Sequence, residues 1–411
     1  MRFPRLLAAA GALTLLVAPA CGAEKPDPAT KVEVFTWWAD GDEKAGLDAL
    51  VGRFTAGCPG HEFENGAVAG GAGVNAKQVL AARIQRNDPP DTFQVHAGAE
   101  LDDYIAAGRV QDLTADYAGW GLRQALPPGL VEDLTVNGKI YSVPADIHRA
   151  NVVWSNPELL AGAGITRPPA TLGALMADLA ALKRSGVEEP LALGRDWTQL
   201  MLLEAVLISD LGAEGFAGLF NGATDWGGSA VTGALEDYAA LLAYSNADRD
   251  SRDWPDARRL LTDGKAAYLV MGDWAAADGL GHFTFPGNGR VFQWLADSFV
   301  LPTGAPNPAG TRCWLRTVAS ADGQRAFNRA KGSIPARTDV GGEGFSAYQV
   351  GAMADWRSGT PVPSCAHGSA CTQDWQNAVN AALGVFSTAT EKDLAGLQQA
   401  LAATAARYIR G

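Results

Sequence analysis

Histidine is scarce in this sequence, with five residues in 411, and no short spacing of carboxylates and histidines indicates a metal site. Basic residues are also few, since 33 Lys and Arg stand against 45 Asp and Glu, a net charge of −12. A chain this acidic is not expected to bind nucleic acid or an anionic membrane surface. Low-complexity tracts and internal repeats are absent, while 47% of the residues are apolar. The composition therefore predicts a compact globular protein, and we expect no cofactor.

Long apolar runs are missing as well. The run at residues 6–17 follows Arg2 and Arg5 and is shorter than the ~20 residues that span a membrane. A basic start, a short apolar stretch and small residues before Cys21 are typical of a secretory signal. We therefore predict a signal peptide at residues 1–20, a lipid anchor on Cys21, as in a bacterial lipobox, and a polar tether at 21–30. This would hold the protein on the outer face of the cell membrane; plain secretion is the alternative.

Four further cysteines make an even number, which in an exported chain suggests disulfides. Three pairings are possible. We prefer a bridge from Cys365 to Cys371, which would close a short loop, and a second from Cys58 to Cys313. A metal cluster is the alternative, because a histidine lies between the last two cysteines. Structural zinc sites usually have tighter Cys-x2–4-Cys spacing, so we expect no metal here.

Short strand-like and helix-like segments alternate along the chain. Strand patterns at residues 32–36, 62–68 and 92–95 are separated by amphipathic helical patterns at 42–55 and 75–85. This order predicts a parallel sheet with crossover helices. The chain is also longer than the ~250–300 residues that one hydrophobic core usually serves. We therefore predict an α/β fold with two lobes, each a mainly parallel sheet flanked by helices, and a hinge between them.

The lobes are expected to be discontinuous in sequence, because the chain crosses between them near Pro144 and Asp297. The predicted bounds are 31–145 plus about 297–345 for lobe 1, and 146–296 plus about 346–411 for lobe 2.

Polar and aromatic residues gather where predicted strands end. Examples are Trp37 and Trp38 after the first strand, and Asp273 and Trp274 after a later one. In open parallel sheets, ligands bind at the carboxyl ends of strands. Tryptophan is frequent, with 12 residues against 5 methionines, and its flat face suits the C–H faces of a sugar. A core position is the alternative for each tryptophan taken alone.

Several segments of the chain carry a family resemblance: VEVFTWWADGDE, GGAGVNA, DPPDTFQVHAG, YSVPADIHRANVVW, LALGRDWTQ, GKAAYLVMGDWAA, SDSFVLP, FNRAKGSIPAR, DWRSG and AHGSA. Through these segments, from about residue 31 to the carboxyl end, the chain resembles the extracellular sugar-binding proteins of ABC importers, in particular their glucose-binding branch. The resemblance implies a two-lobed, periplasmic-binding-protein-like fold that closes by a hinge on one monosaccharide, glucose or galactose first. It also implies delivery of the sugar to the transmembrane subunits of an ABC importer, without catalysis.

The resemblance also implies a set of ligand-binding residues, with Asp42 as an alternative to Glu43 because the chain has one extra residue there. A tryptophan would stack on the sugar ring, acidic and basic groups would bind hydroxyls, and amide or imidazole groups would orient the rest. His148 and Arg149 are more typical of a hinge or lining. The implied set is Trp37, Trp38, Glu43, Gln94, His96, Trp274, Asp297, Lys331 and His367.

Two other functions compete with transport. Paired carboxylates such as Glu43 and Asp297 could serve a glycoside hydrolase. Alternatively, His96, His148 and His367 could converge on zinc in a metal-binding receptor. For Asp297 itself, an ordinary ion pair near the hinge is the alternative to ligand contact.

Overall fold

The computed structural model of the chain describes residues 30–70 and 73–409. The predicted signal peptide, Cys21 and nearly all of the tether lie outside these residues. Within them, no helix combines the length and apolarity needed to cross a bilayer.

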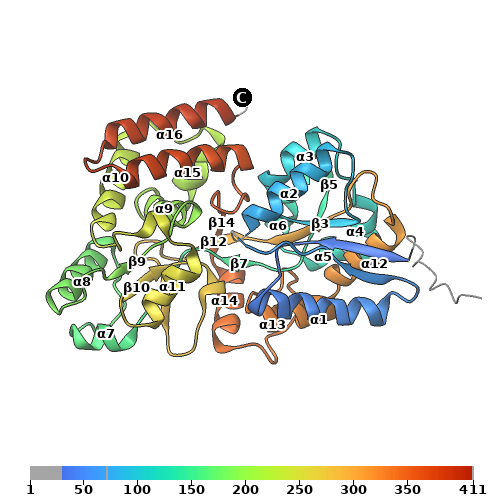
Figure 1. Cartoon of the computed structure of the whole chain (residues 1–411), viewed down its shortest axis with the longest axis horizontal. Coiled ribbons are helices and arrows are strands. Elements are labelled where there is room, and N and C mark those ends of the chain that lie inside the picture. Colours follow the sequence, from blue (N-terminus) through green and yellow to red (C-terminus); the bar gives the residue numbers. More distant parts are fainter. Residues whose placement is uncertain (1–29, 71–72, 410–411) are drawn as a thin grey trace, which may run out of the picture.

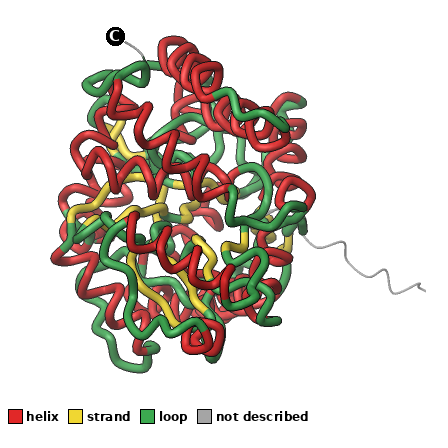
Figure 2. Tube along the Cα trace, turned by 90° about the vertical axis from the view of Figure 1, so that its left-hand side faces the viewer, coloured by secondary structure: helices red, strands yellow, loops and turns green. Residues whose placement is uncertain are grey.

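Two lobes lie side by side along the long axis of the molecule (Figure 1). Each is built around its own hydrophobic cluster, one centred on the sheet that contains Val34 and Phe299, the other on the sheet that contains Val153 and Leu269. An end-on view shows helices outside and strands within (Figure 2). The predicted α/β architecture with two lobes is confirmed. The predicted lobe bounds stay a prediction; Met353, which they place in lobe 2, packs with the first cluster.

The first sheet has the strand order β2-β1-β3-β13-β6. The pairs β1–β2 and β1–β3 are parallel, as predicted for a β-α-β-α-β segment. β13 runs antiparallel to both β3 and β6, because it enters from the other lobe rather than through a crossover helix. The strands are β1 (Lys31–Phe35), β2 (Glu62–Asn65), β3 (Thr92–His96), β6 (Ser142–Pro144) and β13 (Asp297–Val300).

The second sheet has the order β11-β8-β10-β9, and only β9–β10 is parallel. The expectation of a mainly parallel sheet is therefore wrong for this lobe. β8 enters the sheet directly from the hinge and so runs against β10 and β11, a direction that local sequence patterns do not record. The strands are β8 (Val152–Ser155), β9 (Leu191–Ala192), β10 (Tyr268–Val270) and β11 (Gly281–Thr284).

A three-stranded sheet of order β14-β12-β7 lies between the lobes (Figure 1). Only Ala296 separates β12 from β13, and three residues separate β6 from β7, so the chain crosses between the large sheets at two adjacent points. A third connection leads through β14 into the second lobe. This sheet is the structural candidate for the hinge. Its strands are β7 (His148–Arg149), β12 (Val291–Leu295) and β14 (Thr360–Pro363).

Helices cover both large sheets, and a short hairpin, β4 (Thr135–Val136) with β5 (Lys139–Ile140), stands apart. Thr171 caps α8 as predicted, since its Oγ1 accepts from the amide of Ala174 at 3.2 Å. The long helix α9, broken at Gly212, was not predicted. The helices are α1 (Gly41–Gly57), α2 (Val74–Gln85), α3 (Asp102–Ala106), α4 (Thr114–Trp120), α5 (Leu122–Ala125), α6 (Pro128–Asp133), α7 (Pro157–Gly162), α8 (Leu172–Arg184), α9 (Trp197–Asn221), α10 (Ser229–Leu242), α11 (Trp254–Thr262), α12 (Pro308–Ala319), α13 (Ala321–Lys331), α14 (Ala347–Ser358), α15 (Gln373–Thr388) and α16 (Leu394–Tyr408).

Two disulfides join the four described cysteines, in the pairing preferred above. Cys58, at the end of α1, is bonded to Cys313 of α12, with 6.0 Å between the Cα atoms. Cys365 is bonded to Cys371, with Cα atoms 4.9 Å apart, and closes the loop between β14 and α15. With these sulfurs bonded to one another, the structure does not support a metal cluster at Cys365 and Cys371.

Candidate ligand-binding site

A cavity of about 690 Å³ opens between the lobes and is lined from both of them. This volume lies within the range of small-molecule sites, roughly 300–1,000 Å³. A second hollow of about 360 Å³ adjoins it and shares several of its lining residues. Seven of the nine predicted ligand-binding residues line the cavity, and their contact with a ligand stays a prediction: Trp37, Glu43, His96, Trp274, Asp297, Lys331 and His367.

The floor of the cavity is a buried cluster of charges. Lys331 Nζ, at the end of α13, lies 3.0 Å from Asp146 Oδ2 and forms an ion pair with Asp297. His148 of β7 lies 3.1 Å from Asp146 and 3.5 Å from Asp297, and its Nδ1 bonds to Asp273 from the second lobe. The cluster thus joins both lobes through the hinge strand.

The charges in this cluster stabilise one another against the cost of burial. Burial alone would raise the pKa of Asp297, but Lys331 and His148 hold the pKa well below its usual range. Burial lowers the pKa of His148, yet Asp273 and Asp146 raise it well above the usual value, so the ring is charged at neutral pH. Asp146 and Asp297 likewise raise the pKa of Lys331 despite its burial. Ionised groups are therefore present at the cavity floor.

Strand register brings Gln94 and His96 to the same place. In the antiparallel β3–β13 pair, Asp297 lies opposite His96 and Phe299 opposite Gln94. Gln94 Nε2 donates to Asp297 Oδ1 at 2.9 Å, and His96 Nε2 lies 3.7 Å from the same oxygen. Gln94 does not line the cavity, so it supports Asp297 from behind. His96 is held at Nδ1, 2.8 Å from Glu100.

Aromatic rings form an arc around His367. Its ring centroid lies 5.1 Å from Trp274, 5.2 Å from Trp197 and 5.8 Å from His96. His96 in turn lies 5.2 Å from Trp37. Burial, followed by the neighbouring His96 and Lys77, lowers the pKa of His367 well below its usual value, so this imidazole is neutral. The arc offers flat apolar faces beside a hydrogen-bonding ring.

Trp37 and Trp38 point to opposite sides of the chain, as neighbouring side chains of an extended segment do. Trp37 lines the cavity, whereas Trp38 is fully buried and does not. The Trp38 ring lies under Lys331, with Nζ 4.6 Å from the ring centroid, and packs on Phe327 at 4.6 Å. The expectation that Trp38 stacks on a ligand is wrong in this structure, because the α1–α13 layer covers the ring.

The choice between Asp42 and Glu43 is made by the rotation of α1. Glu43 lines the cavity, half-buried, and Asp42 is exposed outside it. Burial raises the pKa of Glu43 to about 7, and Lys331 opposes this shift. Glu43 therefore exchanges a proton close to neutral pH.

Several lining residues lie outside the implied ligand-binding set. Trp197, at the start of α9, and Trp254, at the start of α11, both face the cavity, as does Lys77 of α2. Trp197 follows a short apolar segment, residues 191–193, that is typical of a strand, so its place at a strand end was a signal in the sequence. Lys77 had none; its Nζ is held by Glu100 at 2.9 Å and by Gln373 Oε1 at 2.9 Å.

A zinc site finds little support in the geometry. Both nitrogens of His148 face carboxylates, so the three histidines do not present a joint set of metal ligands. Among the described residues, the group close enough to hold a metal is Asp146, His148 and Asp297. Lys331 Nζ already occupies the place of a cation there. Arg149, expected at the hinge or in the lining, lies in the hinge strand β7 and binds Asp355 at 2.6 Å.

A cavity between two lobes, crossed by a narrow hinge sheet, defines a solute receptor of the periplasmic-binding-protein type. The family described as bacterial extracellular solute-binding protein matches residues 38–325, and the chain belongs to this family. The family is extracytoplasmic, and the fold is that of binding proteins.

Individual relatives agree with this assignment. The chain is 30% identical to an uncharacterized ABC transporter extracellular-binding protein of Pyrococcus horikoshii, over 92% of this chain and 89% of that protein. It is 29% identical to a xylose/arabinose-binding protein of Haloferax volcanii, over 86% and 80% of the two chains. A solved bacterial solute receptor with an exclusive preference for β-D-galactopyranose has the same fold, with a TM-score of 0.81 and 18% identity over 92% of this chain and 99% of that one.

Proposed function

We propose that this protein binds a monosaccharide, a hexose such as glucose or galactose, and delivers it to the transmembrane subunits of an ABC importer. The observation that carries the proposal is the lining of the cavity. Indole faces, ionised groups and neutral hydrogen-bonding groups from both lobes meet in one hollow at the hinge.

The chemistry of the lining suits a sugar better than an apolar or a strongly charged solute. Trp274 and Trp197 offer flat faces to the C–H groups of a pyranose ring. Glu43 and the ion pair of Asp297 with Lys331 can accept from and donate to hydroxyls. Charge-assisted hydrogen bonds contribute ~1.5–3 kcal/mol each, and micromolar affinity needs about 8 kcal/mol. Four or five such contacts provide this even after a hinge closure that costs a few kcal/mol.

Closure around the ligand is part of the proposal. Contacts drawn from both lobes stabilise the closed form only when the sugar is present. The importer subunits then distinguish a loaded receptor from an empty one by its shape. The relatives named as sugar-binding proteins, including a glucose-binding protein of Saccharolobus solfataricus, support this assignment.

We also propose that the receptor is anchored by a lipid on Cys21 after cleavage of residues 1–20, with the polar segment 21–30 as the tether. Metabolic labelling with a fatty acid should tag the wild type but not Cys21→Ser. A wild type that is not labelled would leave plain secretion as the route.

A thermal-shift panel of mono- and disaccharides, followed by calorimetry on each hit, tests the sugar proposal. A ligand that binds only the folded state raises its stability by mass action. Trp274→Ala should weaken binding at least tenfold. Trp120→Ala, at a half-buried tryptophan of α4 outside the cavity, is the matched control and should leave affinity unchanged.

Two results would overturn the proposal. One is a panel in which no sugar stabilises the protein. The other is catalytic release of monosaccharide from labelled oligosaccharides, which would make the protein a hydrolase.

A further inference from the structure

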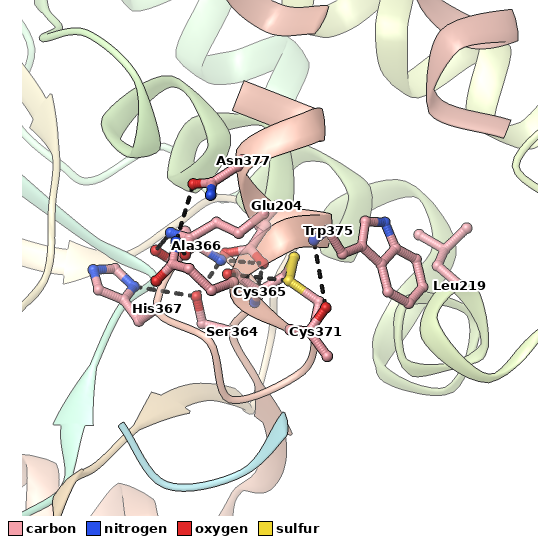
Figure 3. The surroundings of a disulfide bond; sticks show 12 residues. Glu204, Leu219, Ser364, Cys365, Ala366, His367, Cys371, Trp375 and Asn377 are labelled. Carbon is pink, nitrogen blue, oxygen red and sulfur yellow. Dashed lines mark hydrogen bonds between the residues drawn. A yellow bond between two sulfur atoms is a disulfide. The ribbon is translucent and has the colours of Figure 1, made fainter. Parts of the chain in front are cut away.

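A carboxylate that no ligand could reach lies directly beneath the His367 loop. Glu204 of α9 is fully buried. Its Oε1 accepts from the amides of Cys365 at 2.5 Å and Ala366 at 3.2 Å, and its Oε2 accepts from Gln293 Nε2 at 2.7 Å and Ser364 Oγ at 2.8 Å (Figure 3). All four partners donate, so the pocket is built for an ionised carboxylate.

The Ser364 hydroxyl connects this carboxylate to the cavity. Its oxygen lies 3.3 Å from His367 Nδ1. A hydroxyl has one hydrogen, and that hydrogen is used toward Glu204, because an ionised carboxylate can only accept. His367 Nδ1 must therefore donate to Ser364 Oγ. The His367 ring is neutral, since burial and then His96 and Lys77 lower its pKa, and its Nε2 is left without a hydrogen.

The second nitrogen of His367 points away from Ser364 (Figure 3), and the ring lines the cavity beside Trp274 and Trp197. We propose that Glu204 is a positioning and specificity-determining residue, which through Ser364 fixes the His367 tautomer so that Nε2 presents a lone pair to a ligand hydroxyl. The hydroxyl as ligand group rests on the proposed sugar-binding function; the tautomer does not.

The protonation of Glu204 makes the Glu204–Ser364–His367 hydrogen bonds depend on pH. Burial raises the pKa of Glu204 to about 7, against its four hydrogen bonds. Above this pH the ionised Glu204 accepts from Ser364, which keeps the hydrogen of His367 on Nδ1. Below it the protonated Glu204 no longer fixes this orientation, so ligand affinity should fall as the pH drops from 8 to 6. The other charged groups that act on the pKa of His367 are His96, Lys77, His148 and Asp297. Glu43 in the same cavity also titrates near pH 7, and a variant of Glu204 separates its contribution from these.

The decisive variant is Glu204→Gln. Its amide oxygen can accept from the two backbone amides, while its NH2 group donates to Ser364 Oγ. The Gln293 amide, which faces this position with Nε2, turns over so that Oε1, which has no partner among the described residues, accepts from the same NH2 group. Ser364 must then donate to Nδ1, and the hydrogen of His367 moves to Nε2. The disulfide and the bond from Gln376 to the Ala366 carbonyl still hold the loop.

The tautomer is read directly from two-bond 15N–1H correlations of His367 in the empty protein at pH 8. We expect hydrogen on Nδ1 in the wild type, on Nε2 in Glu204→Gln, and a mixture in Ser364→Ala. Ser369→Ala is the matched control in the same loop, because the Ser369 hydroxyl has no partner among the residues that the structure describes, and it should behave as the wild type. A wild-type ring with hydrogen on Nε2, or no change in Glu204→Gln, would overturn the proposal.

Calorimetry with D-glucose and D-galactose provides the second readout. Glu204→Gln should bind about tenfold more weakly at pH 8, a change of ~1.4 kcal/mol, and its affinity should decline less than that of the wild type between pH 8 and 6. Equal affinities of variant and wild type at pH 8 would overturn the role in specificity. If the wild type binds neither sugar, the sugar proposal fails, and the tautomer of the empty protein still decides the role of Glu204.

Discussion

The charge cluster at the cavity floor makes a quantitative prediction about stability. Two cations, Lys331 and His148, are buried with three carboxylates, Asp146, Asp273 and Asp297. Replacing Lys331 by Met leaves one cation against three carboxylates. Replacing Asp297 by Ala leaves two against two. Although both changes break the same ion pair, the loss of Lys331 should be the more damaging.

The magnitudes follow from what each variant leaves buried. Lys331→Met leaves the buried Asp146 and Asp297 without this cation and should cost about 3–5 kcal/mol of unfolding free energy. At ~2–4 °C per kcal/mol, this is a fall in Tm on the order of 10 °C. Asp297→Ala mainly leaves Gln94 Nε2 without its acceptor at 2.9 Å, a cost of about 1–3 kcal/mol.

Urea unfolding of the empty protein measures both values. The double variant should cost less than the sum of the two, since the residues interact directly. The pKa of Asp297 is lowered in the fold, so its contribution is complete above the unfolded value of ~3.9 and disappears as the pH falls through the folded one. The difference between wild type and Lys331→Met should therefore narrow below about pH 4.

The matched control is Lys44→Met, which removes an exposed ion pair with Asp48 and should change stability little, as is usual for surface pairs. The reasoning is refuted if Lys331→Met is no more destabilising than Asp297→Ala, or if both variants unfold like the wild type while losing only ligand affinity.

Three further predictions concern single groups. Glu43→Gln should stabilise the empty protein at pH 8 and have no effect below about pH 4.5. Burial raises the folded pKa of Glu43 to about 7, so the wild type loses stability as the pH rises from about 4.5 through 7. Equal denaturation midpoints of variant and wild type at pH 8 would contradict this. Trp274→Phe should retain part of the ligand affinity that Trp274→Ala loses, since a ring face remains; calorimetry giving both variants the same affinity would argue against stacking. Breaking the Cys58–Cys313 disulfide should cost about 5 kcal/mol of stability, and breaking Cys365–Cys371 about 2 kcal/mol, because Cys58–Cys313 closes a far longer loop. Denaturant titrations of the two double Cys→Ser variants measure both costs, and a larger cost for Cys365–Cys371 would disprove this account.

The predicted site and the observed cavity agree where function follows local position. Trp274 lies just beyond the end of β10, and Asp297 and His96 lie at the facing ends of paired strands, so strand-end clusters in the sequence pointed to the cavity. Trp38 belongs to the implied ligand-binding set but does not line the cavity, because the α13 helix packs over its ring.

Glu204 shows the limit most clearly. It lies inside a long apolar helix and carries no local signal. Its role arises from the loop Ser364–Cys371, about 160 residues later in the chain, whose two amides and one hydroxyl point at the carboxylate. A buried polar network of this kind forms between distant segments, and no periodicity in either segment records it.

The sequence by itself determined the alternation of strands and helices, the two-lobed architecture and most of the polar and aromatic groups at strand ends. These properties depend on the period of apolar residues and on capping and turn residues, which act over a few neighbours. Only the tertiary structure decided strand direction in the second lobe, the choice of Glu43 over Asp42, the inward burial of Trp38 and the charge cluster around Lys331. These depend on crossings, register and helix rotation, where the free energy comes from contacts between residues that are far apart in the chain.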